Sequence, residues 1–312
     1  MKIGFLFPGQ GSQTVGMGRE LVEKYDVAKD IFERANQALG FSLTDLIFEG
    51  PEEELRKTTN TQPAILTTSI AALAVIKQEG LNPDIVAGHS LGEYSALVAA
   101  GVISFEDAVQ LVRKRGAFMQ EAVPLGQGGM AAILGMDRGA VVDICKQVNA
   151  INIVQAVNFN CPGQIVIAGE LKAVEKAAQM LKEAGAKRAI MLPVSAPFHC
   201  SLMRPAAEKL GLELEKIKFT DAKIPIVANI NAQIMTDKDI IKGALVEQAA
   251  SPVLWEDGMQ TLLSKEINTF VEVGPGKVLS GFMKKIDKEA TMLNVEDLVS
   301  LEKTLDYFKE VR

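Results

Sequence analysis

The sequence predicts an α/β protein in which a small domain is inserted into a larger one. The first observation is an apolar run that begins at Ile85, ends in Gly88-His89-Ser90-Leu91-Gly92 and leads directly into a helix-compatible segment. This is the pattern of a nucleophile elbow, a tight turn between a strand and a helix. The second observation is the βαββαβ order of strand and helix patterns between residues 126 and 197, which is typical of the ferredoxin-like unit. A chain of 312 residues is long enough for two domains that each bury a core.

The part before residue 125 is predicted to alternate strands and helices. A buried first strand is expected at residues 3–7, and the glycine-rich loop that follows it lacks the Gly-Lys-Ser/Thr ending of a P-loop. The long helix before the elbow is expected to be amphipathic and to begin at Gln62-Pro63, because proline suits a first turn. The expected helices are residues 64–79, 91–100 and 105–120, the last with an N-cap at Ser104, and short helices and loops are expected within 17–60.

A glycine-rich stretch, residues 125–129, marks the start of the inserted domain. Its expected strands are residues 130–136, 153–159, 164–168 and 189–194, and its expected helices are 139–148 and 171–184. The proline-bracketed loop 193–199 returns the chain to the larger domain. The predicted boundaries are therefore 1–125 with 198–312 for the larger domain and 126–197 for the inserted one.

The larger domain is expected to resume with a helix near residues 201–210. The elements expected after it are strand 224–230, helix 239–250, strand 269–273 with the turn Gly274-Pro275-Gly276, a further helix, and a short strand and terminal helix within 290–312. Pro252 is expected to end the helix that precedes it.

Ser90 is the candidate nucleophile, because glycines on both sides of an elbow allow the strained turn that exposes its hydroxyl. The helix that begins at Leu91 directs free N–H groups and its positive dipole end at whatever Ser90 attacks. The simpler alternative is that Ser90 is an ordinary helix N-cap. If strand 3–7 lies beside strand 84–88, the loop after the first strand brings Gln10 close to Ser90, although that loop can also be a purely structural turn.

A serine nucleophile that needs an imidazole base has two candidates, since the chain contains only His89 and His199. Neighbouring residues that leave a strand project to opposite faces, so His89 is poorly placed to reach the serine hydroxyl. His199 is therefore the expected base, although a lone histidine can also be structural. Residues 113–115 form a basic run, Arg-Lys-Arg, that commonly faces solvent, but helical spacing turns the three side chains in different directions and one of them can face inward.

The composition is that of an ordinary globular chain, with 48% apolar and 23% charged residues. The balance of 39 acidic and 33 basic residues argues against general nucleic-acid binding. Cys145, Cys161 and Cys200 lack paired spacing and a histidine-rich surrounding, so we expect neither a disulfide framework nor a metal site, and a reducing, cytoplasmic compartment. The N-terminal apolar run is too short for a signal peptide, and no stretch approaches the roughly 20 apolar residues of a membrane span.

Several motifs taken together resemble one family, the malonyl-CoA:acyl carrier protein transacylases of fatty acid synthesis. The motifs are Phe7-Pro8-Gly9-Gln10-Gly11-Ser12-Gln13, Gly88-His89-Ser90-Leu91-Gly92-Glu93, Arg115-Gly116 with Met119-Gln120, Pro197-Phe198-His199, Gln248 and Gly274-Pro275-Gly276. The resemblance extends over essentially the whole chain, and the combination is far more specific than any one motif. It implies an α/β-hydrolase-like large domain that carries the catalytic residues and is interrupted by a ferredoxin-like domain.

The resemblance also implies roles for individual residues. Ser90 attacks the malonyl thioester, His199 is the base, and the N–H groups of Gln10 and Leu91 form the oxyanion hole. The backbone carbonyl of Gln248 orients the imidazole of His199 in place of the usual acidic residue, and His89 supports the site from behind the reacting groups.

Three further residues are implied to bind the substrate. Arg115 binds the free malonyl carboxylate through two parallel charge-assisted hydrogen bonds, which lysine cannot copy. Met119 and Phe198 line the acyl pocket, and the bulk of Phe198 is expected to exclude an α-methyl branch, so that malonyl is preferred to methylmalonyl. The triplet here is Pro-Phe-His, where the polyketide relatives usually have Ala-Phe-His.

The implied partners are malonyl-CoA as substrate and acyl carrier protein as a transient partner, with no permanently bound cofactor, no metal and a monomeric state. Lys187, Arg188 and Arg204 are candidates for docking the acidic carrier protein, although such residues are commonly solvated surface cations. Two other functions use the same motifs: a hydrolase, in which water resolves the acyl-enzyme, and a non-catalytic acyl-CoA-binding subunit.

Overall fold

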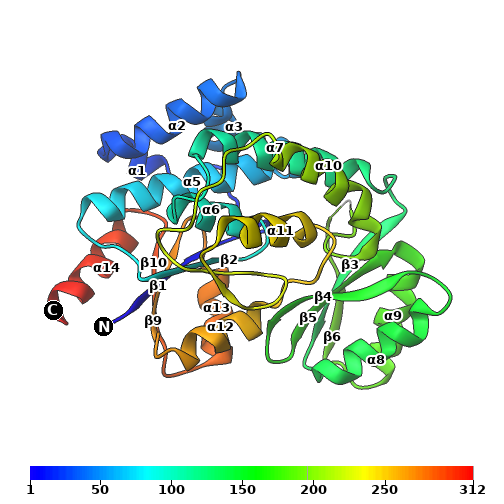
Figure 1. Ribbon diagram of the computed structural model, residues 1–312. Coiled ribbons are helices and arrows are strands. Elements are labelled where there is room, and N and C mark those ends of the chain that lie inside the picture. The colour runs from blue at the N-terminus through cyan, green and yellow to red at the C-terminus, as the bar shows by residue number, and fades with distance from the viewer. Residues whose placement is uncertain (195, 312) are drawn as a thin grey trace.

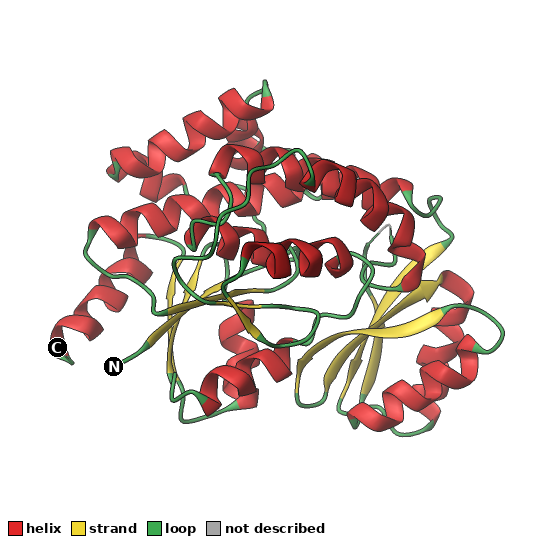
Figure 2. Ribbon diagram, viewed as in Figure 1, coloured by secondary structure: helices red, strands yellow, loops and turns green. Residues whose placement is uncertain are grey.

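The protein has a mixed α/β fold with two β-sheets that lie next to each other (Figures 1 and 2). The computed structural model describes residues 1–194 and 196–311. Ser195, which belongs to the predicted loop 193–199, and Arg312 lie outside the described residues. None of the described helices combines the length and the apolar character that a membrane span requires.

The larger sheet has six strands in the order β10-β9-β1-β2-β7-β8. Their bounds are Thr291–Val295 (β10), Thr269–Val273 (β9), Ile3–Phe7 (β1), Ile85–Gly88 (β2), Ile226–Val227 (β7) and Ile234–Met235 (β8). All pairings are parallel except the one between β7 and β8. The predicted neighbourhood of strands 3–7 and 84–88 is confirmed, since Phe7 pairs with Gly88 at the ends of β1 and β2. The loop after β1 and the elbow after β2 therefore leave the same edge of the sheet.

Helices cover both faces of this sheet (Figure 1). One layer consists mainly of α1 (Arg19–Lys24), α2 (Asp26–Leu39), α3 (Leu43–Glu49), α4 (Glu52–Leu55), α5 (Thr58–Gln78), α6 (Gly92–Ala99), α7 (Phe105–Glu121), α10 (Arg204–Leu214), α11 (Lys238–Gln248) and α14 (Leu298–Glu310). A short 3-10 turn, Ser201–Met203, precedes α10. The other face is covered by α12 (Trp255–Ser264) and α13 (Val278–Ile286), which pack on side chains of β1, β2 and β9.

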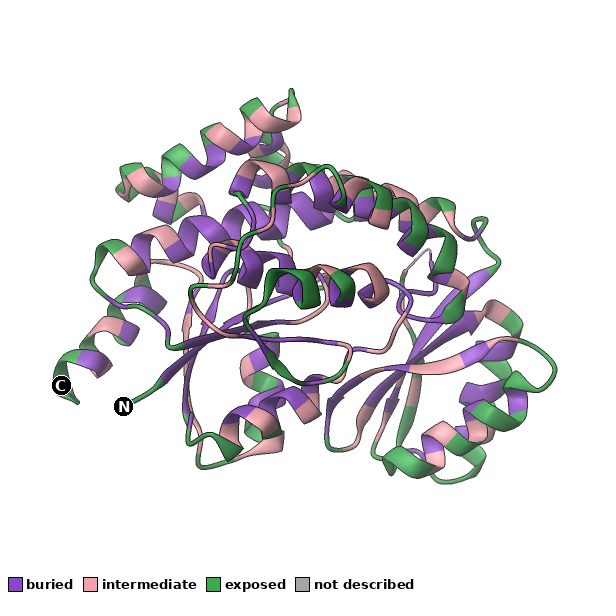
Figure 3. Cartoon of the chain, viewed as in Figure 1, coloured by how far each residue is buried: buried purple, intermediate pink, exposed green. Residues whose placement is uncertain are grey.

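The prediction for α5 was wrong in two respects. The helix begins at Thr58, because the carbonyl of Lys57 already accepts hydrogen bonds from the N–H groups of Asn60 and Thr61, so Pro63 lies inside the helix and not in its first turn. The helix is also not amphipathic. It runs between the sheet and the outer helices, and most of its residues are buried on all sides (Figure 3).

The smaller sheet is antiparallel, with the order β4-β5-β3-β6. Its strands are Gly128–Leu134 (β3), Val154–Cys161 (β4), Gln164–Glu170 (β5) and Arg188–Met191 (β6). Helices α8 (Arg138–Asn149) and α9 (Leu171–Glu183) enclose a separate apolar core against one face. The order of elements is the predicted βαββαβ, although β6 ends at Met191 and does not reach residue 194 as expected.

Strand β4 of the small sheet is hydrogen-bonded to the segment that precedes α12, a helix that packs on the large sheet. Val253, just before α12, donates to the carbonyl of Val157 at 2.7 Å and accepts from the N–H of Phe159 at 3.0 Å. Helix α12 was not predicted, and the expected strand 224–230 is reduced to the two residues of β7. The side of β4 next to the elbow is therefore fixed in place by main-chain hydrogen bonds.

Candidate active site

Ser90 occupies the tight turn between β2 and α6, with a φ angle of 52°. The positive φ is a strained conformation for a residue with a side chain, and it is the mark of a nucleophile elbow. The flanking glycines are required by close packing: a Cβ on Gly88 would collide with the carbonyl of Gly92, and a Cβ on Gly92 would collide with the carbonyl of Phe7. The turn is thus pressed against the end of β1.

Asn229, which follows β7, holds the elbow on both sides of the serine. Its Oδ1 accepts from the Ser90 N–H at 2.7 Å, and its Nδ2 donates to the Gly88 carbonyl at 2.7 Å. The alternative that Ser90 is an ordinary N-cap does not hold, because no side chain caps α6 and the Ser90 hydroxyl is directed to His199 instead.

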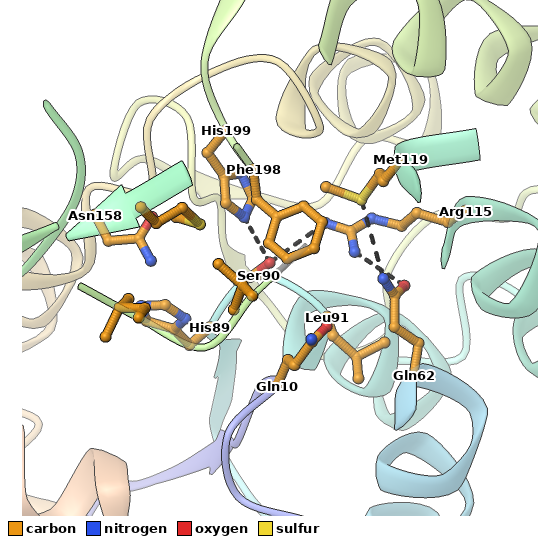
Figure 4. A pocket seen from close by; sticks show the side chains of 13 residues that line it. Gln10, Gln62, His89, Ser90, Leu91, Arg115, Met119, Asn158, Phe198 and His199 are labelled. Carbon is orange, nitrogen blue, oxygen red and sulfur yellow. Dashed lines mark hydrogen bonds between the residues drawn. The ribbon is translucent and has the colours of Figure 1, made fainter. Parts of the chain in front are cut away.

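His199 and Ser90 are in hydrogen-bond contact, with 2.6 Å between Nε2 and Oγ (Figure 4). The other ring nitrogen, Nδ1, lies 2.9 Å from the backbone carbonyl of Gln248. A carbonyl can only accept, so Nδ1 carries the proton and Nε2 is free to accept the hydrogen of Ser90. Burial, with a contribution from the charge of Arg115, lowers the pKa of His199 to about 3. The imidazole is therefore neutral at physiological pH, as a general base must be.

His89 points away from the serine hydroxyl. Its Nε2 lies 2.8 Å from Oδ1 of Asn160 on β4, and its ring is 5.5 Å from that of Trp255. Burial lowers the pKa of His89. His89 thus ties the elbow to the small sheet, and its expected supporting role remains a prediction.

Arg115 is the member of the basic run that faces inward. It is only 2% exposed, whereas Lys114 pairs with Glu213 on the outside and Arg113 stacks on Phe41. The guanidinium donates from Nη1 to Gln62 Oε1 at 2.9 Å and from Nη2 to Ser90 Oγ at 3.3 Å. The Nε hydrogen has no acceptor among the described residues. Burial lowers the pKa of Arg115, but a guanidinium keeps its charge in proteins.

Both polar atoms of the Gln248 side-chain amide extend this network. Oε1 accepts from Arg115 Nη2 at 2.9 Å, and Nε2 donates to Glu93 Oε2 at 2.8 Å and to the Ser90 carbonyl at 2.7 Å. Glu93 is buried in the first turn of α6, and burial raises its pKa to about 7. Sequence reasoning did not single out Gln62, Glu93 or Asn229. Glu93 stands within the serine motif, which was the only signal that could have drawn attention to it.

Ser90, Arg115 and His199 face a cavity of about 110 Å³ between the two sheets (Figure 4). The residues that line it are Gln10, Gln62, His89, Ser90, Leu91, Arg115, Met119, Met130, Asn158, Leu192, Val194, Phe198 and His199. All the predicted site residues are in this set except Gln248, which lies behind His199 and Arg115. Asn158, on β4, was not predicted, and its buried Oδ1 has no hydrogen-bond partner in the described part of the chain.

A second cavity of about 550 Å³ adjoins the first and shares five of its lining residues, Gln10, His89, Asn158, Leu192 and Val194. It extends between the loop after β1, the small sheet and α13. The backbone N–H groups of Gln10 and Leu91 donate to no acceptor of residues 1–194 or 196–311, so both are available to a ligand in the smaller cavity.

The remaining predicted residues lie away from these cavities. Lys187 and Arg188 are exposed next to and on β6, and Arg204 pairs with Glu247 at 2.7 Å on the surface. Their role in docking a carrier protein stays a prediction. In the described residues, no cluster of three or more His, Cys, Asp or Glu side chains could hold a metal ion.

The chain matches the acyl transferase domain family over residues 4–309. It is 54% identical over 310 residues to a malonyl CoA-acyl carrier protein transacylase of Bacillus subtilis, covering 99% of this chain and 98% of that protein. It is 51% identical over 286 residues to the protein of the same name from Escherichia coli K12, covering 91% and 93%.

Solved structures are similar over the same length. A malonyl CoA-acyl carrier protein transacylase from Clostridium perfringens has a TM-score of 0.97 and 49% identity, covering 100% of this chain and 98% of that chain. A malonyl-transacylase in complex with a type II polyketide acyl-carrier protein has a TM-score of 0.96 and 45% identity, covering 98% and 100%.

Proposed function

We propose a reaction mechanism for this chain, which belongs to the acyl transferase domain family. The enzyme transfers a malonyl group from malonyl-CoA to acyl carrier protein, a step of fatty acid synthesis. The observation that carries the mechanism is the meeting of three groups in one cavity: a serine hydroxyl, a neutral imidazole 2.6 Å from it, and a buried guanidinium 3.3 Å from it.

In the first half-reaction, Ser90 Oγ attacks the thioester carbonyl of malonyl-CoA while its proton passes to His199 Nε2. The oxygen that becomes negative accepts hydrogen bonds from the N–H groups of Gln10 and Leu91. Loss of one such donor typically costs about 3 kcal/mol of transition-state stabilisation. The tetrahedral intermediate then expels the CoA sulfur, which takes the proton from His199, and the malonyl group stays on Ser90 as an ester.

In the second half-reaction, the phosphopantetheine thiol of acyl carrier protein replaces CoA in the larger cavity. His199 Nε2 removes the thiol proton, and the thiolate attacks the ester carbonyl of malonyl-Ser90. The C–O bond to Ser90 breaks, the serine oxygen recovers its proton from His199, and malonyl-acyl carrier protein leaves. Throughout the cycle the Gln248 carbonyl keeps the Nδ1 proton in place, so that Nε2 performs every transfer. The chain supplies every reacting group itself, and we propose that it needs no bound cofactor.

Substrate choice is assigned to Arg115. The free carboxylate of malonyl would accept two charge-assisted hydrogen bonds from the guanidinium, whereas an acetyl group would leave this buried cation without a partner. Met119 and Phe198 are buried in the wall of the same cavity, and we propose that Phe198 blocks an α-methyl branch. Replacing Phe198 with valine should increase methylmalonyl transfer relative to malonyl transfer in a competition between the two CoA thioesters.

We also propose the finer architecture expected from the sequence. The residues 1–125 and 198–312 would form an α/β-hydrolase-like catalytic domain, and residues 126–197 would form a ferredoxin-like inserted domain. The antiparallel order β4-β5-β3-β6 and the two helices on one face support the second assignment. Three free, buried cysteines support a reducing, cytoplasmic setting, and we propose a monomer that binds the carrier protein transiently.

One experiment tests the function directly. The protein is mixed with malonyl-CoA and with acetyl-CoA, and the adduct on Ser90 is identified by mass spectrometry. The expected result is a malonyl ester on Ser90 that is absent from Ser90→Ala and that moves to a pantetheine thiol faster than it is released to water. Predominant release to water would indicate a hydrolase, and an unmodified Ser90 would indicate a non-catalytic acyl-CoA-binding subunit.

A further inference from the structure

Glu93 is a buried carboxylate that takes no part in the acyl transfer. It is 4% exposed, and both of its oxygens accept hydrogen bonds, Oε2 from Gln248 Nε2 at 2.8 Å and Oε1 from the Asn229 N–H at 3.3 Å. Both neighbours are donors at these positions and cannot accept a hydrogen bond from a protonated carboxyl group. The geometry therefore fits the ionised form of Glu93.

The side-chain amide of Gln248 connects this carboxylate to Arg115. Its oxygen accepts from Arg115 Nη2 at 2.9 Å while its nitrogen donates to Glu93. A guanidinium can only donate and a carboxylate can only accept, so the two neighbours decide which end of the amide faces which. Glu93 and Arg115 are thus opposite charges held on the two sides of one amide group.

Neither charge has another ionic partner in the described part of the chain, since no salt bridge involves Arg115 or Glu93. A buried charge without a counter-charge is costly, so each of the two stabilises the other across Gln248.

The other titratable groups around them carry no competing charge. His199 and His89 have lowered pKa values because of burial, and burial raises the pKa of Tyr94 to about 12, so all three are neutral near pH 7. Arg113 and Lys114, on the same helix as Arg115, have other partners: Arg113 stacks on Phe41, and Lys114 pairs with Glu213.

We propose, on the basis of the function above, that Glu93 is the resident counter-charge of Arg115 and limits how tightly the malonyl carboxylate is held. In the free enzyme Glu93 offsets part of the guanidinium charge through Gln248. The charge of Arg115 is therefore already partly neutralised when the malonyl carboxylate enters. Arg115 still binds malonyl more strongly than an uncharged acyl group, but weakly enough for the malonyl group to be transferred to acyl carrier protein. Without Glu93 the malonyl-enzyme would be more stable and would release its acyl group more slowly, whereas an uncharged acyl group would not be affected. Glu93 does not touch the substrate and acts through Gln248 as a positioning residue.

The test compares Glu93→Gln, which removes the charge and keeps the length, with Glu93→Asp, which keeps the charge on a shorter side chain. The quantity measured is the equilibrium constant for acylation of Ser90 in mixtures of malonyl-CoA and CoA, from intact-protein mass spectrometry, with acetyl-CoA and CoA in parallel. In Glu93→Gln we expect the malonyl constant to rise roughly tenfold, the size of a typical coupling between neighbouring charged groups. The acetyl constant should stay the same, kcat for transfer to pantetheine should fall, and Glu93→Asp should remain close to the wild type.

A matched double variant isolates the charge effect. In an Arg115→Met background, Glu93→Gln should leave the ratio of malonyl to acetyl constants unchanged, because the guanidinium that it modulates is gone.

The wild type offers a measurement that depends on no variant. Because burial raises the pKa of Glu93 to about 7, the malonyl constant should rise as the pH falls from about 8 to about 6, and the acetyl constant should not.

Three results would overturn the proposal: equal losses for malonyl and acetyl in Glu93→Gln, a lower malonyl constant in that variant, or a malonyl constant that is independent of pH in the wild type. Each would mean that Glu93 only supports the fold or the orientation of Gln248. Failure of the proposed function is distinguishable, because it would leave the wild-type Ser90 without a malonyl group. A malonylated wild type with an unshifted Glu93→Gln refutes the counter-charge alone.

Discussion

Replacing Arg115 with alanine should raise the use of acetyl-CoA relative to malonyl-CoA. The guanidinium is buried, and its Nε hydrogen has no acceptor in the described residues, so the free site holds a cation with unused donor capacity. A carboxylate bound there would gain two charge-assisted hydrogen bonds, each worth about 1.5–3 kcal/mol. The loss of both is expected to cost about 3–5 kcal/mol, which lowers kcat/KM for malonyl-CoA by a factor of about 100 to 4,000.

The assay is a competition between malonyl-CoA and acetyl-CoA, with both acyl-enzymes quantified on Ser90 by mass spectrometry. Arg113→Ala is the matched control, because Arg113 lies on the same helix and stacks on Phe41 with 4.2 Å between the guanidinium carbon and the ring centre. It should leave the malonyl preference unchanged. Circular dichroism and urea unfolding would be used to check that Arg115→Ala is folded. A folded Arg115→Ala with the wild-type preference would show that the carboxylate binds elsewhere and that the reasoning is wrong.

Three further predictions follow from the same network. Since the pKa of His199 is lowered to about 3, the base stays neutral in mild acid, and the rate of Ser90 malonylation at pH 5 should be within about threefold of that at pH 7. A base with the ordinary histidine pKa of about 6.5 would slow the rate about 25-fold in a stopped-flow or quench-flow measurement. Gly92→Ala should destabilise the fold by about 3 kcal/mol or more in urea, because its Cβ would collide with the Phe7 carbonyl, whereas Gly243→Ala in α11 has open space and should stabilise by about 0.5–1 kcal/mol. Asn229→Ala should lower kcat about tenfold or more and lower the free energy of unfolding by about 1–3 kcal/mol, since the Ser90 N–H and the Gly88 carbonyl lose their partner; an unchanged kcat would mean that the elbow keeps its shape without Asn229.

Elements that depend on neighbouring residues could be predicted from the sequence. Strand β9 has the predicted bounds, Thr269–Val273, and α7 begins after Ser104, whose hydroxyl accepts from the Asp107 N–H at 3.1 Å as an N-cap should. The elbow was recognisable because glycine and serine at fixed spacing are what the turn itself requires.

Elements that depend on packing could not be predicted. Helix α12 begins after Leu254 without any side-chain cap, so the sequence lacks a capping residue there, and the acidic Glu256 and Asp257 in the first turn are the one local start signal. Helix α5 begins before Pro63 because it is buried between the sheet and the outer helices, and that environment outweighs the local preference of proline for a first turn.

The residues of the site divide in the same way, into those that a local pattern reveals and those that only the folded chain brings together. Ser90, His199 and Arg115 belong to residue types and motifs that have a recognisable chemistry. Gln62, Glu93 and Asn229 are ordinary polar residues whose contacts with the site join positions 53, 155 and 139 residues apart in the chain. No local pattern specifies such pairs, because only the folded chain brings them together.

The choice of a carbonyl as the partner of His199 fits the reaction better than a carboxylate would. A carboxylate at Nδ1 would stabilise the imidazolium and raise the pKa of the base, whereas the neutral Gln248 carbonyl, burial and the nearby Arg115 keep that pKa low. In the second half-reaction the attacking group is a thiol, whose pKa lies well below the value of roughly 15.7 for water. A thiol therefore reaches its ionised, nucleophilic form with less help from a weak base than water does, which favours transfer of the acyl group to the thiol over its loss to water. The burial that makes the base weak also limits the access of water to Ser90.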